Sequence, residues 1–311
     1  MKPTLVTSYV NPDLDGTACA IAYAELLTKI GTPATAGIFG GFHVEARFVL
    51  DRFKIPYPPI LKDGLDVERA VVVDMSRPEG LEGLLPIERI IEVIDHRKIN
   101  ALGLFPNAKL QIELVGAAAT LIAERFIREK QPISEGAAVL LYGAIFSNTL
   151  NFKSSVATDR DREAVLWLQT HATIPDTFIA EMFRAKSDLA GGKLKEGILS
   201  DISWRSMKGN RCTIGALEII GVKALMKDRL PEMLQIVAEF KETHHAKPAL
   251  LTLIDLEEGF TAFVTGDRET QELLQKTLPV SFTGGVARYP QMLMRKQLFP
   301  LLEQVIEGEK V

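Results

Sequence analysis

The sequence is poor in cysteine and in long apolar runs, and both shortages exclude classes of protein. It has two cysteines, Cys19 and Cys212, which do not form a C-x-x-C pair. A disulfide scaffold and a thiolate zinc site are therefore excluded, and a reducing cytoplasm fits. No run of about 18 apolar residues predicts a membrane span, and the first residues lack the pattern of a signal peptide. We expect a cytoplasmic protein without a membrane partner.

An excess of positive charge is also missing. Thirty-six Lys and Arg residues stand against 40 Asp and Glu residues, which gives a net charge of −4. General nucleic-acid binding usually shows as a basic excess, so we do not expect nucleic acid as a partner. The Walker and Rossmann glycine fingerprints do not occur between a predicted strand and a predicted helix, so neither nucleotide fold is expected.

The chain does contain enough apolar residues, 47% of 311, for the cores of two ordinary domains. Its first part alternates short apolar runs with helical patterns, which predicts an α/β domain. Continuous apolar strands are typical of a parallel sheet covered on both faces. The predicted strands are 4–7, 34–39, 70–74 and 90–95, and the predicted helices are 18–30, 43–53, 116–130 and 134–146.

A change in composition near residue 190 divides the chain. The segment 188–197 is rich in Gly and Lys and is predicted to be a linker between a domain of residues 1–187 and one of residues 198–311. The second domain also shows both kinds of pattern, so we expect a smaller α/β unit. Its predicted strands are 212–220, 249–255 and 262–265, and its predicted helices are 223–243 and 268–277.

Acidic residues follow three of the predicted strands in the first domain. Asp13 and Asp15 stand in an Asn-Pro-Asp-Leu-Asp turn after the predicted strand 4–7. Asp74 ends the predicted strand 70–74, and Asp95, which precedes His96, ends the predicted strand 90–95. Sites on parallel sheets lie at the carboxyl ends of strands, so these side chains should meet. Carboxylates with imidazole suit Mn²⁺ or Mg²⁺. Alone, each aspartate could equally cap the element that follows it.

Four segments resemble, in order, the motifs of the DHH phosphoesterase superfamily. The likeness is to its branch of manganese-dependent (family II) inorganic pyrophosphatases, exopolyphosphatases and prune, and it covers nearly the whole chain. The four segments are Asn11–Asp15, Val73–Asp74, Val93–Arg97 and Ser147–Ser154. Further segments that resemble landmarks of the branch are 45–50, 115–120, 255–259 and 294–300, the last of which is similar to its R-K-K-Q-x-x-P signature.

The resemblance implies an N-terminal parallel-sheet DHH domain, a smaller C-terminal substrate-binding domain and an active-site cleft between them. It implies an enzyme that uses Mn²⁺ or Mg²⁺ and a metal-activated water to hydrolyse the phosphoanhydride bonds of pyrophosphate or short-chain polyphosphate. The implied metal ligands are Asp13, Asp15, Asp74, His96 and Asn148; the implied catalytic residues are Asp74, His96 and Arg97; the implied substrate-binding residues are Arg97, Lys153, Arg295 and Lys296.

Four positions depart from the pyrophosphatase pattern. Tyr9 stands at a histidine ligand, and its phenol is a poor ligand at neutral pH. Arg97 stands at the second histidine of Asp-His-His, as in the prune branch. Asn148 replaces a ligand aspartate and removes a negative charge, and Met294 replaces the first arginine of the basic run.

These departures leave two alternatives to the hydrolase open. One is a catalytically weak protein that binds or senses a phosphorylated ligand on the same scaffold, and the other is a phosphodiesterase of small nucleotides. Either would share the small phosphorylated ligand as its partner. A homodimer paired through an edge strand of the first domain is also left open.

Overall fold

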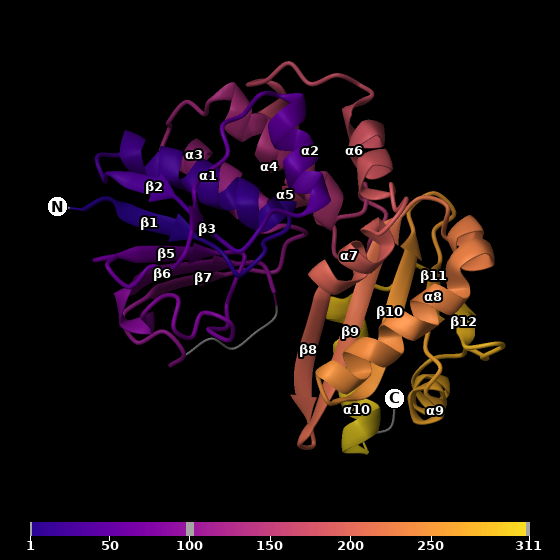
Figure 1. The fold of residues 1–311 in the computed structure, drawn as a ribbon. Helices are drawn as coiled ribbons and strands as arrows, with labels where there is room; N and C mark the ends of the chain where they lie inside the picture. The colour runs from indigo at the N-terminus through magenta and orange to yellow at the C-terminus, as the bar shows by residue number, and fades with distance from the viewer. Residues whose placement is uncertain (1, 98–102, 309–311) are drawn as a thin grey trace. The chain divides into compact units, whose positions relative to one another are not determined.

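The computed structural model describes residues 2–97 and 103–308. The chain divides into two compact units, Met1–Ala185 and Lys186–Val311. In Figure 1 the first unit runs from indigo to pink and the second from orange to yellow. Among the described residues, no helix is long and apolar enough to cross a membrane.

A five-stranded sheet forms the centre of the first unit, and all of its strand pairs are parallel. Strands β1 and β5 are buried at every position, as a sheet covered on both faces requires. The predicted parallel α/β fold is therefore confirmed. In spatial order the strands are β2 (Ala34–Ala36), β1 (Thr4–Thr7), β5 (Ala70–Val73), β6 (Ile90–Asp95) and β7 (Lys109–Ile112).

Helices cover one face of this sheet in two layers (Figure 1). Helices α1 (Leu14–Lys29) and α3 (Ala118–Arg128) contact the strands, and α4 (Glu135–Asn148) and α5 (Asp159–Gln169) pack on those two helices. Alanines on the buried part of α1 allow this close packing. On the other face, apolar side chains of residues 75–89 and 103–108 pack against the strands; they include Met75, Leu81, Leu85 and Phe105.

The predicted strand 34–39 is two short strands rather than one. After β2 the chain leaves the main sheet, and β3 (Ile38–Phe39) pairs with β4 (Ile60–Leu61) instead. Gly37 lies at the break, where a Cβ atom would come within 2.6 Å of the Leu61 side chain and 2.9 Å of the Leu5 side chain. The close approach of three segments at this glycine explains why the strand ends there.

The second unit is built on a mixed five-stranded sheet. Strands β9 (Asn210–Ile219) and β10 (Ala246–Asp255) are parallel and are joined through α8 (Val222–Thr243), whereas every other pair is antiparallel. Three of these strands were predicted, but the edge strands β8 (Ile202–Met207) and β12 (Val286–Tyr289) were not. The strand order is β12-β11-β10-β9-β8, with β11 at Thr261–Val264.

Helices cover both faces of this second sheet. Helices α7 (Lys193–Ser200) and α8 form one apolar core with it, and α9 (Arg268–Thr277) and α10 (Arg295–Glu307) form the other. Helix α7 occupies the second half of the predicted linker 188–197. Its Leu194 and Ile198 are one helical turn apart and fully buried, so this segment packs as a helix of the second unit.

Candidate metal centre and active site

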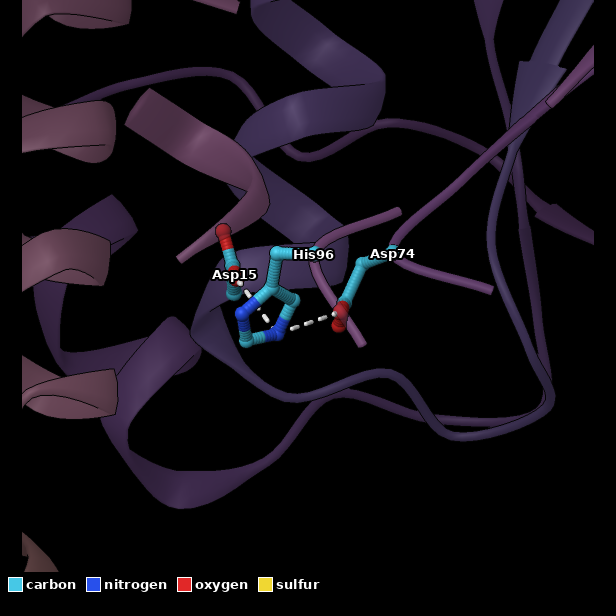
Figure 2. A group of neighbouring side chains, drawn as sticks. All are labelled: Asp15, Asp74 and His96. Atoms are coloured by element: carbon cyan, nitrogen blue, oxygen red, sulfur yellow. Dashed lines mark ion pairs between the residues drawn. The ribbon is translucent and has the colours of Figure 1, made fainter. Parts of the chain in front are cut away.

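Three side chains converge at the carboxyl ends of the first sheet. Asp15 lies in the first turn of α1, Asp74 directly follows β5 and His96 directly follows β6. His96 Nε2 lies 3.4 Å from Asp74 Oδ1 and 3.8 Å from Asp15 Oδ2 (Figure 2). One ligand atom from each of the three lies within 4.8 Å of the others, and all three residues are buried. In the part of the chain that the structure describes, no other group of three His, Cys, Asp or Glu residues is so arranged.

The hydrogen bonds of His96 leave its other ring nitrogen suited to a metal ion. Its Nδ1 lies 3.0 Å from the carbonyl oxygen of Val115. A carbonyl can only accept, so Nδ1 carries a proton, and in the neutral imidazole the lone pair is then on Nε2. That lone pair lies on the side of Asp15 and Asp74. A histidine that donates to a backbone carbonyl in this way is typical of metal ligands.

Asp15 accepts hydrogen bonds from four donors. The backbone N–H groups of Ala118 and Ala119 each donate to it at 2.8 Å, the side-chain amide of Asn148 donates at 2.6 Å and the Cys19 thiol at 3.4 Å. Ala118 and Ala119 belong to the first turn of α3, whose N–H groups have no partner within the helix. A helix N-terminus therefore fixes this carboxylate in place.

The electrostatics of the group favour a bound cation. Burial, followed by the charge of Asp74, raises the pKa of Asp15 to about 7. A divalent ion among these side chains would favour the ionised carboxylates, because it would offset the burial and the repulsion from Asp74 that raise the pKa of Asp15. Oxygen donors with one imidazole nitrogen are a donor set that Mn²⁺ and Mg²⁺ accept. The residues present therefore fit such an ion.

Asp13 lies beside this group and has a structural task of its own. Its side chain caps α1 by accepting a hydrogen bond from the N–H of Gly16 at 3.0 Å, so Asp13 has the capping role that the sequence also allowed for Asp15. The N–H of Asp13 donates to the Tyr9 hydroxyl at 3.1 Å. Burial, then Asp13 and Asp74, raises the pKa of Tyr9, so this phenol stays protonated.

Asp74 follows β5 and Asp95 is the last residue of the neighbouring β6, and the two side chains have different contacts. Asp74 has φ of 52°, a left-handed backbone that is unusual for a residue other than glycine and is often found at functional sites. Asp95 is fully buried, and its Oδ1 accepts the N–H of His96 at 2.7 Å. The same oxygen lies 4.0 Å from Arg97 Nε. Asp95 thus shapes the turn that carries His96 and is outside the three-residue group.

Arg97 reaches into the site from the residue after His96. Its Nη2 donates to Asp74 Oδ1 at 2.9 Å, and its guanidinium carbon lies 5.9 Å from the centre of the Tyr9 ring. The side chain is 32% exposed. A permanent cation therefore stands next to the predicted metal ligands.

The other predicted substrate cations lie on different elements. Lys153 is exposed on the turn that follows α4, where the three preceding residues, 150–152, all have left-handed φ values between 52° and 59°. Arg295 and Lys296 begin α10 in the second unit. Arg295 donates to the carboxylate of Asp201 and, at 2.6 Å, to the Asp201 carbonyl. Met294 precedes this helix as its N-cap residue.

Two residues that support the site were not predicted from the sequence. Asp161, fully buried on α5, accepts hydrogen bonds from the Gly116 N–H at 2.9 Å, the Thr120 hydroxyl at 2.5 Å and the N–H and hydroxyl of Thr158 at 2.7 Å each. It therefore fixes the turn 115–119, which supplies the Val115 carbonyl to His96 and the Ala118 and Ala119 N–H groups to Asp15. The run of small residues that begins at Gly116 was the one available signal.

Glu45 is the second such residue. Its carboxylate lies 3.4 Å from the N–H of Leu14 and 3.0 Å from the hydroxyl of Ser147, and the residue is buried. It joins the start of α1, next to the first two aspartates, to the end of α4, next to Asn148. Its segment, 45–50, was noted for its resemblance to the family, but no role was assigned to it.

Comparison with known proteins places the chain in a family. No family model matches it. A Clostridium acetobutylicum protein named a probable manganese-dependent inorganic pyrophosphatase is 31% identical over 310 residues, which cover 98% of each chain. The chain belongs to the manganese-dependent (family II) inorganic pyrophosphatase family. Another member of this family, the manganese-dependent inorganic pyrophosphatase of Methanothrix thermoacetophila, is 29% identical over 313 residues, 97% of this chain and 98% of that protein.

Solved structures agree with this family membership. A Methanococcus jannaschii protein assigned to the family II inorganic pyrophosphatases matches with a TM-score of 0.83 and 25% identity, over 97% of this chain and 99% of that one. An exopolyphosphatase-related protein from Bacteroides fragilis, 11% identical, shares the fold with a TM-score of 0.51. The predicted resemblance to family II pyrophosphatases and the two-domain fold are confirmed.

Proposed function

We propose that this chain is a manganese-dependent inorganic pyrophosphatase, which hydrolyses pyrophosphate to phosphate. The observation that carries the proposal is the buried group of Asp15, Asp74 and His96 in a chain 31% identical, along almost its whole length, to a protein named for that activity. Mg²⁺ is compatible with the same donors. The binding-protein and phosphodiesterase alternatives are not favoured, because the relatives are named as pyrophosphatases.

We propose Asp15, Asp74 and His96 as the side chains that hold the ion, with Asp13 and Asn148 next to them. The bound ion supplies Lewis-acid chemistry, because it acidifies water and offsets negative charge on phosphoryl oxygens. The chain shields these three residues from bulk solvent, since each is at most 4% exposed. In such surroundings an electrostatic contact is stronger than it would be in water.

Arg97 is proposed to bind the substrate beside the ion. Its Nη2 is fixed by Asp74, and the side chain is 32% exposed; a guanidinium offers five N–H donors, so those that Asp74 does not use can donate to phosphoryl oxygens. Its position next to the ligands also gives it a catalytic role, because it can offset charge that develops on phosphorus oxygens. Lys153, Arg295 and Lys296 are proposed as further phosphate-binding cations, with Arg295 held by Asp201.

The proposal is tested by phosphate release from pyrophosphate, tripolyphosphate and ATP with Mn²⁺, Mg²⁺ or EDTA. We expect release from pyrophosphate that requires metal and falls at least about a hundredfold in Asp74→Asn. Asparagine accepts a left-handed backbone, so this variant should fold. Asp51→Asn is the matched control, because Asp51 is exposed and contacts Tyr57 rather than the site. Unchanged release in the Asp74 variant, or none from any substrate, would refute the proposal.

We also propose that the enzyme works in the cytoplasm as a homodimer. Both cysteines are free and buried, which suits a reducing compartment. Strand β7 is an edge strand of the first sheet, and Leu114 just beyond it is 63% exposed, so this edge offers unpaired backbone groups and an apolar side chain to a second copy. Light scattering on the purified protein would measure the mass, and a monomer at all concentrations would exclude the dimer.

A further inference from the structure

Each departure from the family pattern in the first unit contacts one of the three predicted acidic ligands. Arg97 donates to Asp74 at 2.9 Å and Asn148 donates to Asp15 at 2.6 Å. The Tyr9 hydroxyl accepts the N–H of Asp13 at 3.1 Å. Arg97 also stacks near the Tyr9 ring, 5.9 Å from its centre. The substituted residues therefore form one connected set around the carboxylates and are not scattered changes.

Two of these substitutions change the charge of the site in the same direction. The side-chain amide nitrogen of Asn148 lies 2.6 Å from Asp15 Oδ2 and donates a hydrogen bond to it. An aspartate at position 148 would place a carboxylate oxygen there instead. Two carboxylates this close need a shared cation or a proton. Arginine at position 97 adds a permanent positive charge where the family pattern has a neutral imidazole. Together the two substitutions raise the site's charge by two units, which is the charge of one divalent ion.

The ligand atoms suit one ion. Ligands about 2.1 Å from an octahedral ion lie about 3.0 Å apart when adjacent and about 4.2 Å apart when opposite. The separations from His96 Nε2 to Asp74 Oδ1 and Asp15 Oδ2, 3.4 Å and 3.8 Å, fall between these values. A second ion at the bridging distance of about 3.5–4 Å would find no second group of three such ligands among the described residues, and beside Asp74 it would meet the guanidinium of Arg97. Like charges at that distance repel strongly in a buried site.

We propose that this chain holds a single divalent ion, at Asp15, Asp74 and His96, and that Arg97 and Asn148 take the electrostatic place of a second. The inference rests on the proposed function, because it takes the metal dependence from there. Arg97 offsets the charge of Asp74, and Asn148 donates a hydrogen bond to Asp15 without adding a negative charge. The carboxylates are then balanced with one ion bound, and a second ion would meet a fixed positive charge.

The test measures the metal and not the activity. The whole protein is loaded with Mn²⁺ and desalted, its metal content is determined by mass spectrometry, and Mn²⁺ is titrated by calorimetry. Paramagnetic resonance of the loaded protein separates an isolated Mn²⁺, with resolved hyperfine lines, from a coupled pair with broadened lines. We expect one tightly bound ion per chain, a second binding step at least about a hundredfold weaker, and the spectrum of an isolated ion.

The double variant Arg97→His with Asn148→Asp should gain the second ion and the spectrum of a coupled pair. Asn148→Asp alone serves if the double variant does not fold. Arg268→His with Asn210→Asp is the matched control, because it makes the same charge change at exposed positions of the second unit, and it should keep one ion. Two equally tight ions in the native protein, or a folded Arg97 and Asn148 variant that still binds one, would overturn the inference.

The two proposals fail separately. One bound ion without pyrophosphate hydrolysis would refute the proposed function and leave the single-ion centre standing. Hydrolysis by a protein with two tightly bound ions would do the reverse. A native protein that binds no Mn²⁺ would overturn both.

Discussion

Replacing Asp161 with asparagine should loosen the metal centre from a distance, although Asp161 touches none of the predicted ligands. Its carboxylate accepts from the Gly116 N–H, the Thr120 hydroxyl and both donors of Thr158. Asparagine has almost the same volume but offers one acceptor oxygen, and its amide N–H groups would face donors. The substitution therefore removes acceptors without creating a cavity.

The size of the effect follows from the bonds that are lost. A hydrogen bond to a charged group contributes about 1.5–3 kcal/mol, and a buried donor left without its acceptor costs about 1–3 kcal/mol. Asparagine replaces one carboxylate oxygen of Asp161 with an NH₂ group, so the donors to that oxygen lose their acceptor. The free energy of unfolding of the first unit should therefore fall by about 3 kcal/mol. Because the turn 115–119 also orients His96, the affinity for Mn²⁺ should fall about 10–100-fold.

Urea unfolding and calorimetric titration with Mn²⁺ measure these two quantities. Asp159→Asn is the matched control: Asp159 is in the first turn of the same helix but exposed, so its loss should cost less than about 1 kcal/mol and leave the affinity unchanged. If Asp161→Asn unfolds within about 0.5 kcal/mol of this control, or binds Mn²⁺ equally well, the reasoning that the turn is held by Asp161 is wrong.

Two further variants test local features of each unit. Asn151→Val should lower the free energy of unfolding by about 1–2 kcal/mol, because a β-branched residue resists its φ of 55°, whereas Asn151→Gly should change it little; urea unfolding of both decides. Asp267→Asn should cost up to about 1 kcal/mol, since asparagine can still cap α9 but lacks the charge that pairs with Lys241 and faces the helix N-terminus. Burial opposes the shift, but bonds from Lys241 and Thr270 lower the pKa of Asp267, so its contribution should be present above about pH 4 and disappear as the pH falls through the lowered value. Glu269→Gln, at an exposed ion pair, is the control and should have little effect at any pH.

The convergence of Asp15, Asp74 and His96 could be predicted because the parallel topology brings the ends of their strands together. Once β1, β5 and β6 are neighbours in one sheet, Asp15, Asp74 and His96 must lie at the same edge. The apolar runs were long enough to reveal those three strands. No knowledge of side-chain packing was needed for that step.

The supporting groups could not be predicted for a different reason. The Ala118 and Ala119 N–H groups and the Val115 carbonyl are backbone atoms, which carry no residue-type signal in the sequence. In the sequence, Asp161 looks like an ordinary acidic residue in the first turn of a helix. Only the tertiary structure shows that it accepts a hydrogen bond from Gly116, 45 residues away. Edge strands such as β8 were not predicted, because their partly exposed residues do not form a continuous apolar run.

The left-handed turn at residues 150–152 has a consequence for immunochemistry. Each such residue other than glycine costs about 1–2 kcal/mol in a free chain, so a synthetic peptide spanning 147–156 would adopt the native bend in less than about 1% of its molecules. Antibodies raised against that peptide should therefore recognise the denatured protein and ignore the folded one, even though Asn151 and Lys153 are exposed in the fold. Such a serum would be a reporter of unfolding for the first unit in crude extracts, where spectroscopy cannot be used.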